Sequence, residues 1–89
     1  MNMRQLKIVN EKGLHARASA KFVECVEGFD AQAEVTKDGM TVSGDSIMGL
    51  LMLGASRGTF IDVSTSGTQA IELAVALEEP VAHRFGEEQ

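Results

Sequence analysis

The spacing of apolar and polar residues divides the chain into short strands and helices. Alternation at period two predicts strands at 31–37, 40–42 and 60–66, and Leu6–Ile8 has the pattern of a first strand. Asp38–Gly39, a dipeptide typical of two-residue hairpin turns, lies between the strands at 31–37 and 40–42. The sequence therefore predicts four strands, of which one neighbouring pair forms a hairpin.

Three further segments have the apolar spacing of helices. A stripe runs from Ala16 to Glu27, and Gly28 provides a natural C-terminal stop. The apolar segment Ile47–Leu53 follows Ser46, a preferred N-cap residue, and predicts a helix of about two turns. The expected buried stripes are Ala16, Ala20, Phe22, Val23 and Val26 in the first helix, and Ala70, Leu73, Ala74 and Leu77 in the third.

The third helix is expected to begin after a cap at Gly67–Thr68 and to end or kink near Glu79. Pro80 should end or kink the helix there, because proline lacks a backbone N–H and its ring clashes with the preceding turn. A last turn is expected between Pro80 and Phe85. The order β-α-β-β-α-β-α then predicts an α+β fold of two layers, with helices on one face of a mainly antiparallel sheet.

The composition fits one small domain that spans residues 1–89. Hydrophobic residues make up 44% of the chain, which is ordinary for a globular protein. The chain has no Trp or Tyr and four Phe, so its core must be built mainly from aliphatic side chains. Cys25 is the single cysteine, which rules out an internal disulfide and the CxxC pattern of a metal chaperone.

The charge distribution argues against several classes of partner. With 13 acidic and 8 basic residues the net charge is −5, and the basic residues are scattered singly. Nucleic-acid binding needs a basic face, so it is not expected. Residues 1–6 lack the apolar core of a signal peptide, and the longest apolar run, Ile47–Leu53, is far too short to span a membrane. We expect a cytoplasmic protein with no membrane insertion.

His15 is the residue best placed for chemistry. It lies where a polar loop meets the first helix, and the free amides and dipole of a helix start favour an anion. Neutral imidazole has an unprotonated ring nitrogen near pH 7, and Arg17 could neutralise phosphate oxygens. His15, Arg17 and the amides of Ala16 and Arg17 could together hold a phosphoryl group on nitrogen. From these residues alone, an exposed loop histidine beside a solvated arginine is the commoner outcome.

The segment Ile47–Leu53 is too hydrophobic for a helix with one solvated face. Some of its side chains must lie in the core, and the rest form an exposed apolar patch. Such a patch, rich in adaptable methionine, is typical of a surface that docks partner proteins. The expected core residues are Leu50 and Leu53, and the expected outward residues are Met48, Leu51 and Met52.

Two other polar residues are weaker candidates for a site. Ser46 is expected to be a helix cap whatever else it does, and a phosphate at that position would meet the same helix amides. His83 lies in the last turn and is expected to be a surface residue. The sequence contains no GxGxxG or GxxxxGK[ST] motif and no cluster of metal ligands, so we expect no nucleotide, metal or other cofactor.

Two separated motifs resemble the signatures of a known family. The segments Gly13–Ala18 (GLHARA) and Gly44–Gly54 (GDSIMGLLMLG) resemble those of the histidine-containing phosphocarrier (HPr) family of the bacterial phosphotransferase system. The order of elements and the closing Phe85–Glu88 are similar as well, so the resemblance covers the whole chain. It implies an HPr-like open-faced sandwich, in which three helices cover one face of a four-stranded antiparallel sheet.

The resemblance implies a stoichiometric carrier and not an enzyme with its own turnover. In such carriers the histidine matching His15 takes a phosphoryl group on Nδ1 from enzyme I, which draws on phosphoenolpyruvate, and passes it to an EIIA-type protein. Arg17 matches the arginine that supports the phosphate, and Ser46 matches the serine that an HPr kinase/phosphorylase modifies in many bacteria. A monomer is expected. The surface that docks these partners is expected at Ile47, Met48, Leu51 and Met52.

Departures from the family pattern leave some questions open. Family members often have Pro where Ala18 stands, but proline is only favourable early in a helix. Ala18–Ala20 resembles the nitrogen-related regulatory branch, so sugar transport and nitrogen regulation both remain candidates. Two other functions are considered: a purely regulatory binding module, and an acylphosphatase-like hydrolase. The hydrolase would need a second polar group near His15 to activate water, and the sequence indicates none.

Overall fold

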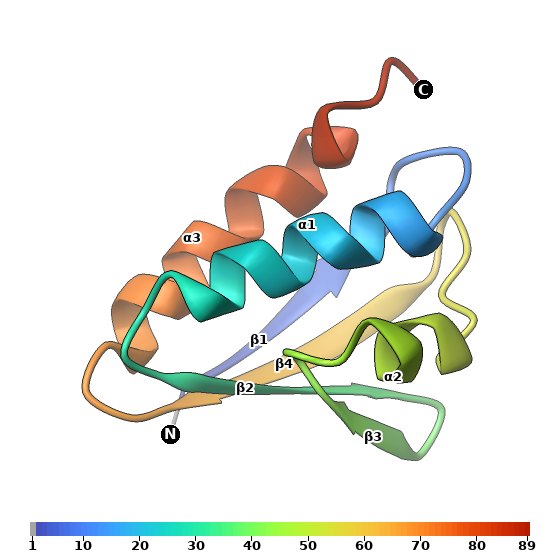
Figure 1. Cartoon of the computed structure of the whole chain (residues 1–89). Coiled ribbons are helices and arrows are strands. Elements are labelled where there is room, and N and C mark those ends of the chain that lie inside the picture. The colour runs from blue at the N-terminus through green and yellow to red at the C-terminus, as the bar shows by residue number, and fades with distance from the viewer. Residues whose placement is uncertain (1) are drawn as a thin grey trace.

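A four-stranded antiparallel sheet, in the order β1-β4-β2-β3, has three α-helices packed on one of its faces within residues 2–89 (Figure 1). The computed structural model describes these residues. The sequence predicts this architecture. The strands are β1 (Asn2–Lys7), β2 (Gln32–Lys37), β3 (Met40–Ser43) and β4 (Phe60–Ser66), and the helices are α1 (Ala16–Glu27), α2 (Ile47–Met52) and α3 (Ala70–Ala82), followed by the 3₁₀ turn Arg84–Gly86.

The hairpin between β2 and β3 confirms the turn predicted from its dipeptide. Asp38 and Gly39 have φ of 51° and 82°, the paired left-handed conformations of a type I′ turn. The turn sets the register, in which Lys37 pairs with Met40 and Val35 with Val42. None of the helices within residues 2–89 is long and apolar enough to cross a membrane.

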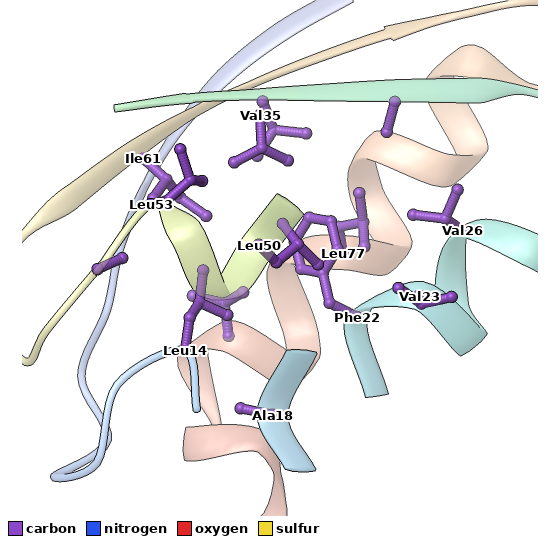
Figure 2. Packing of buried hydrophobic residues seen from close by; sticks show 14 of the residues in the cluster. Leu14, Ala18, Phe22, Val23, Val26, Val35, Leu50, Leu53, Ile61 and Leu77 are labelled. Atoms are coloured by element: carbon purple, nitrogen blue, oxygen red, sulfur yellow. The ribbon is translucent and has the colours of Figure 1, made fainter. Parts of the chain in front are cut away.

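Strand β4 is central and pairs with β1 on one side and β2 on the other. Its alternation is the predicted one, because Ile61, Val63 and Thr65 are buried while Phe60 and Ser66 are exposed. Figure 2 shows Val35 and Ile61 of the sheet facing the side chains of the helices. The buried face of the sheet and the three helices therefore share one core.

The buried stripe of α1 differs from the predicted one. Phe22, Val23 and Val26 are buried as expected. Ala16 is exposed and Ala20 is half-buried, and the other two buried positions are Ala18 and Ser19. Leu14, just before the helix, is buried and sets the phase. Buried residues then recur every four positions, at 14, 18, 22 and 26, as one helix face requires. The apolar side chain of alanine suggests burial in a sequence pattern, but it is so small that its exposure to water costs little.

The ends of α3 also differ from the sequence-based expectation. The N-cap is Gln69, not Gly67–Thr68, and its side-chain oxygen accepts a hydrogen bond from the Asp30 N–H at 2.7 Å. The helix continues through Pro80 to Ala82. Proline removes one N–H from the last turn, and the burial of Val81 at 2% exposure holds that turn against the core.

Three backbone hydrogen bonds place the loop before α1 against the loop before β4. The Ile8 N–H donates to Thr59 O at 2.8 Å, and the Gly58 N–H donates to Ile8 O at 2.7 Å. Further along, the Leu14 N–H donates to Ala55 O at 2.9 Å. These contacts fix where α1 begins, and they thereby position His15.

Candidate functional site

His15 is the N-cap residue of α1, as its place in the sequence indicated. Its backbone is extended, with φ −74° and ψ −178°, and its side chain is 28% exposed and makes no capping hydrogen bond. The first N–H groups of a helix have no partner within the helix. The amides of Ala16 and Arg17 therefore face a position where the helix dipole favours an anion.

Residues on both sides hold His15 in place. Leu14 is buried in the core, so the chain is anchored one residue before the histidine. The buried Ser19 donates its N–H to His15 O at 2.8 Å and its hydroxyl to Leu14 O at 3.1 Å. The start of the helix is thus fixed through backbone atoms, and the imidazole remains at the surface.

The imidazole makes its side-chain contact with the C-terminal tail. His15 Nε2 is hydrogen-bonded to Glu87 Oε2, and the two groups form an ion pair when the ring is protonated. The other oxygen of the same carboxylate accepts a hydrogen bond from Asn10 Nδ2 at 3.0 Å. Within residues 2–89 no hydrogen bond is made to His15 Nδ1. One ring nitrogen is therefore engaged and the other is available.

The electrostatic state of Glu87 follows from these contacts. Burial acts to raise the pKa of its carboxyl. The hydrogen bonds from Asn10 and His15, together with the charges of His15 and Lys12, outweigh burial and hold the pKa of Glu87 below its usual value. Because the pKa of Glu87 is lowered in the folded state, its contacts stabilise the fold at pH values above the usual glutamate pKa. That stabilisation is lost as the pH falls through the lowered pKa.

Asn10 is a further part of the site that pattern reasoning missed. Its side chain is fully buried, and Nδ2 also donates to Gly13 O at 2.8 Å. It therefore joins the loop before α1 to the tail. A lone asparagine in a polar loop carries no periodic signal, and the sequence marks Glu87 only as part of the closing Phe85–Glu88, which resembles the family's tail.

Arg17 lies in the first turn of α1 with an exposed side chain. Within the described part of the chain it makes no side-chain hydrogen bond or ion pair. The structure thus places the guanidinium on the same turn as the unpaired amides without engaging it elsewhere. Its support of a phosphate on His15 stays a prediction.

The second candidate region has the geometry expected from sequence. Ser46 is the N-cap of α2, and its hydroxyl oxygen accepts the Gly49 N–H at 3.0 Å. Leu50 and Leu53 are buried, as predicted. The outward side chains, hereafter the α2 patch, are exposed by 40% for Ile47, 70% for Met48, 37% for Leu51 and 66% for Met52.

His83 is outside the site, as expected. It is exposed at the end of α3, and its Nδ1 lies 2.9 Å from Glu79 O of the same helix. A ring nitrogen that contacts a carbonyl oxygen must carry the proton, so Nδ1 of His83 is not a free acceptor. Of the two histidines, the structure leaves the Nδ1 position available at His15 alone.

Comparison with known proteins gives consistent matches over nearly the whole chain. The family model described as "PTS HPr component phosphorylation site" matches residues 3–83. The phosphocarrier protein HPr of Neisseria meningitidis is 42% identical over 87 residues, which cover 98% of each chain. A crystal structure of HPr-C-His from Thermoanaerobacter tengcongensis matches with a TM-score of 0.94 and 38% identity over 100% of both chains. A crystal structure of an HPr dimer from the same organism has a TM-score of 0.77 and 38% identity, and covers 98% of this chain and 100% of that one.

Proposed function

The chain belongs to the HPr family and is a phosphocarrier of the phosphotransferase system, and from this premise we propose that His15 is the residue that carries the phosphoryl group. The observation that supports this assignment is the state of its ring, with Nε2 bonded to Glu87 and Nδ1 without a partner in residues 2–89. Nδ1 is then the nucleophile. The amides of Ala16 and Arg17 and the Arg17 guanidinium receive the phosphate oxygens.

The partners follow from this role. The donor is phosphorylated enzyme I, which draws on phosphoenolpyruvate, and the acceptor is a histidine of an EIIA-type protein. The carrier acts in the cytoplasm as a monomer and is used stoichiometrically, because its phosphohistidine is an intermediate that leaves with each transfer. Sedimentation of the unphosphorylated chain tests the monomer, and a stable dimer at micromolar concentration contradicts it.

The experiment for this function is labelling with purified enzyme I, phosphoenolpyruvate and Mg²⁺. We expect one acid-labile phosphate per chain, mapped by mass spectrometry to His15. Adding an EIIA-type protein should then remove the label from the carrier. Labelling without onward transfer to any EIIA-type protein indicates a purely regulatory module. Absence of labelling contradicts the carrier assignment at His15.

We propose that the α2 patch docks both donor and acceptor. The four side chains leave large apolar surface in water on a helix of six residues, and α2 packs against α1, whose N-cap is His15. Met48→Glu should raise the KM of enzyme I for the carrier about tenfold, because a charge must be desolvated in the interface. Ile71→Glu is the matched control, since Ile71 is 62% exposed on α3. An equal KM for the two variants contradicts docking at this patch.

Phosphorylation of Ser46 is proposed as an off switch. The residue is half-buried at the border of the α2 patch, and a phosphate adds about −1.5 to −2 charges there. Phosphorylation by an HPr kinase/phosphorylase should slow the labelling of His15 about three- to tenfold, with less slowing at high salt because surface charges are screened. Ser46→Asp, with less charge, should show a smaller effect, and Ser66→Asp on the exposed end of β4 should show none. Unchanged labelling of the phosphoserine form leaves Ser46 as a helix cap alone.

A further inference from the structure

We propose that Glu87 is a positioning residue for phosphoryl transfer: its carboxylate keeps the His15 proton on Nε2, so that the lone pair of Nδ1 is free to accept phosphorus. The same carboxylate then stabilises the positive charge that the ring acquires. This inference rests on His15 as the phosphoacceptor, and it assigns a function to the C-terminal tail. In Figure 1 that tail and the loop before α1 lie at the same end of the molecule.

The backbone of the tail is held in a conformation that places the Glu87 side chain beside His15. Arg84, Phe85 and Gly86 have successive φ values of 59°, 53° and 79°, which turn the chain back after α3. Two of them are not glycine, and left-handed backbone at such residues persists only where the surroundings enforce it. Here Phe85 is buried to 1% exposure, and its carbonyl accepts a hydrogen bond from Lys21 Nζ at 2.5 Å.

A second anchor lies on the other side of Glu87. Gln89 O accepts the Glu11 N–H at 2.9 Å, which ties the end of the chain to the loop before α1. With Phe85 on one side and Gln89 on the other, the tail is fixed without any contact to His15. The hydrogen bond to the imidazole is therefore additional to what anchoring the tail requires.

The two carboxylate oxygens have separate roles. Oε1 accepts from the buried Asn10 Nδ2 at 3.0 Å, which orients the group, and Oε2 is left for His15 Nε2. An ionised carboxylate can only accept hydrogen bonds, so Nε2 must carry the proton. The depressed pKa of Glu87 agrees with a carboxylate that is ionised at neutral pH. A neutral imidazole with its proton on Nε2 has its lone pair on Nδ1.

The transfer step then needs no proton movement. The Nδ1 lone pair forms a bond to phosphorus while the bond between phosphorus and the donor atom breaks, and that electron pair stays on the donor. The ring of His15 keeps its Nε2 proton and becomes positively charged. A carboxylate hydrogen-bonded to the far nitrogen stabilises that charge, as in catalytic dyads in which an acidic residue orients a histidine and stabilises its imidazolium form.

The first test is the position of the proton in the unmodified chain. In ¹⁵N-labelled protein at a pH where His15 is neutral, we expect the Nε2–H tautomer to predominate. Glu87→Gln should give a mixture of tautomers, because the amide can either accept from Nε2–H or donate to unprotonated Nε2. The control is Glu88→Gln, which removes the same charge from the next, exposed residue and should leave the wild-type tautomer unchanged. A proton on Nδ1 in the wild-type chain overturns the proposal without need of any variant.

The second test is the rate of labelling by phospho-enzyme I. We expect Glu87→Gln to lower kcat by about tenfold or more, because the carboxylate stabilises a charge that the ring acquires only during transfer, with little change in KM for the carrier. Glu88→Gln should match the wild type. A wild-type chain that takes no label contradicts the proposed function itself. A labelled wild type with equal kcat in both variants overturns only the role of Glu87.

Discussion

A His15→Ala chain is expected to take up no acid-labile phosphate from enzyme I and phosphoenolpyruvate while remaining folded. The imidazole supplies the nitrogen that bonds to phosphorus, and no other imidazole lies on the first turn of α1. The side chain is part-exposed and its hydrogen bond goes to Glu87 Oε2, so its removal leaves the core intact. Circular dichroism and urea unfolding should therefore show a loss of stability of about 1 kcal/mol or less.

Two further variants make this result specific. His83→Ala should label like the wild type, because His83 lies outside the site with Nδ1 at the Glu79 carbonyl. Arg17→Ala should still label, but about 10²–10³ times more slowly if its guanidinium acts mainly in the transition state. Normal labelling of His15→Ala, or acid-labile phosphate on His83, contradicts the assignment. An unchanged rate for Arg17→Ala shows that the backbone amides are sufficient.

A Gly13→Ala substitution is expected to destabilise the domain by about 3 kcal/mol or more. Gly13 has a φ of +65°, and a Cβ added there would lie 2.3 Å from Ala55 O and 2.9 Å from the Cα of Ser56. These are backbone atoms, and Ala55 O is also the acceptor of the Leu14 N–H at 2.9 Å. Relief of the overlap must separate the two loops that position His15, so the labelling rate should fall as well.

Gly54→Ala separates the two causes of this loss, which are the left-handed backbone conformation and the steric overlap of the added Cβ. Gly54 has nearly the same φ, +61°, but a Cβ there meets nothing within 4 Å. Its substitution should cost about 1–2 kcal/mol, which is the penalty of left-handed backbone for a residue with a Cβ. Urea unfolding of both variants, followed by circular dichroism, measures the difference. Equal losses would show that the close approach of the two loops contributes nothing.

The sequence by itself determined the elements and their order. Strand β4 has the predicted bounds, and the turn at Asp38–Gly39 adopts the predicted conformation. Ser46 caps α2, and the partition of that helix into core and outward side chains is also the predicted one. These features depend on neighbours in the chain, through alternation at period two, helical spacing at 3.6 residues and the preferences of cap and turn residues.

Only the tertiary structure decided the features that depend on distant neighbours. The phase of α1 was set by Leu14, which is buried because its loop is bonded to Ala55. Helix α3 passes through Pro80 because burial of Val81 holds its last turn against the core. The pairing of His15 with Glu87 joins residues 72 positions apart. No local pattern records such a contact, because it exists only once the helices are packed on the sheet and the tail turns back on the loop before α1.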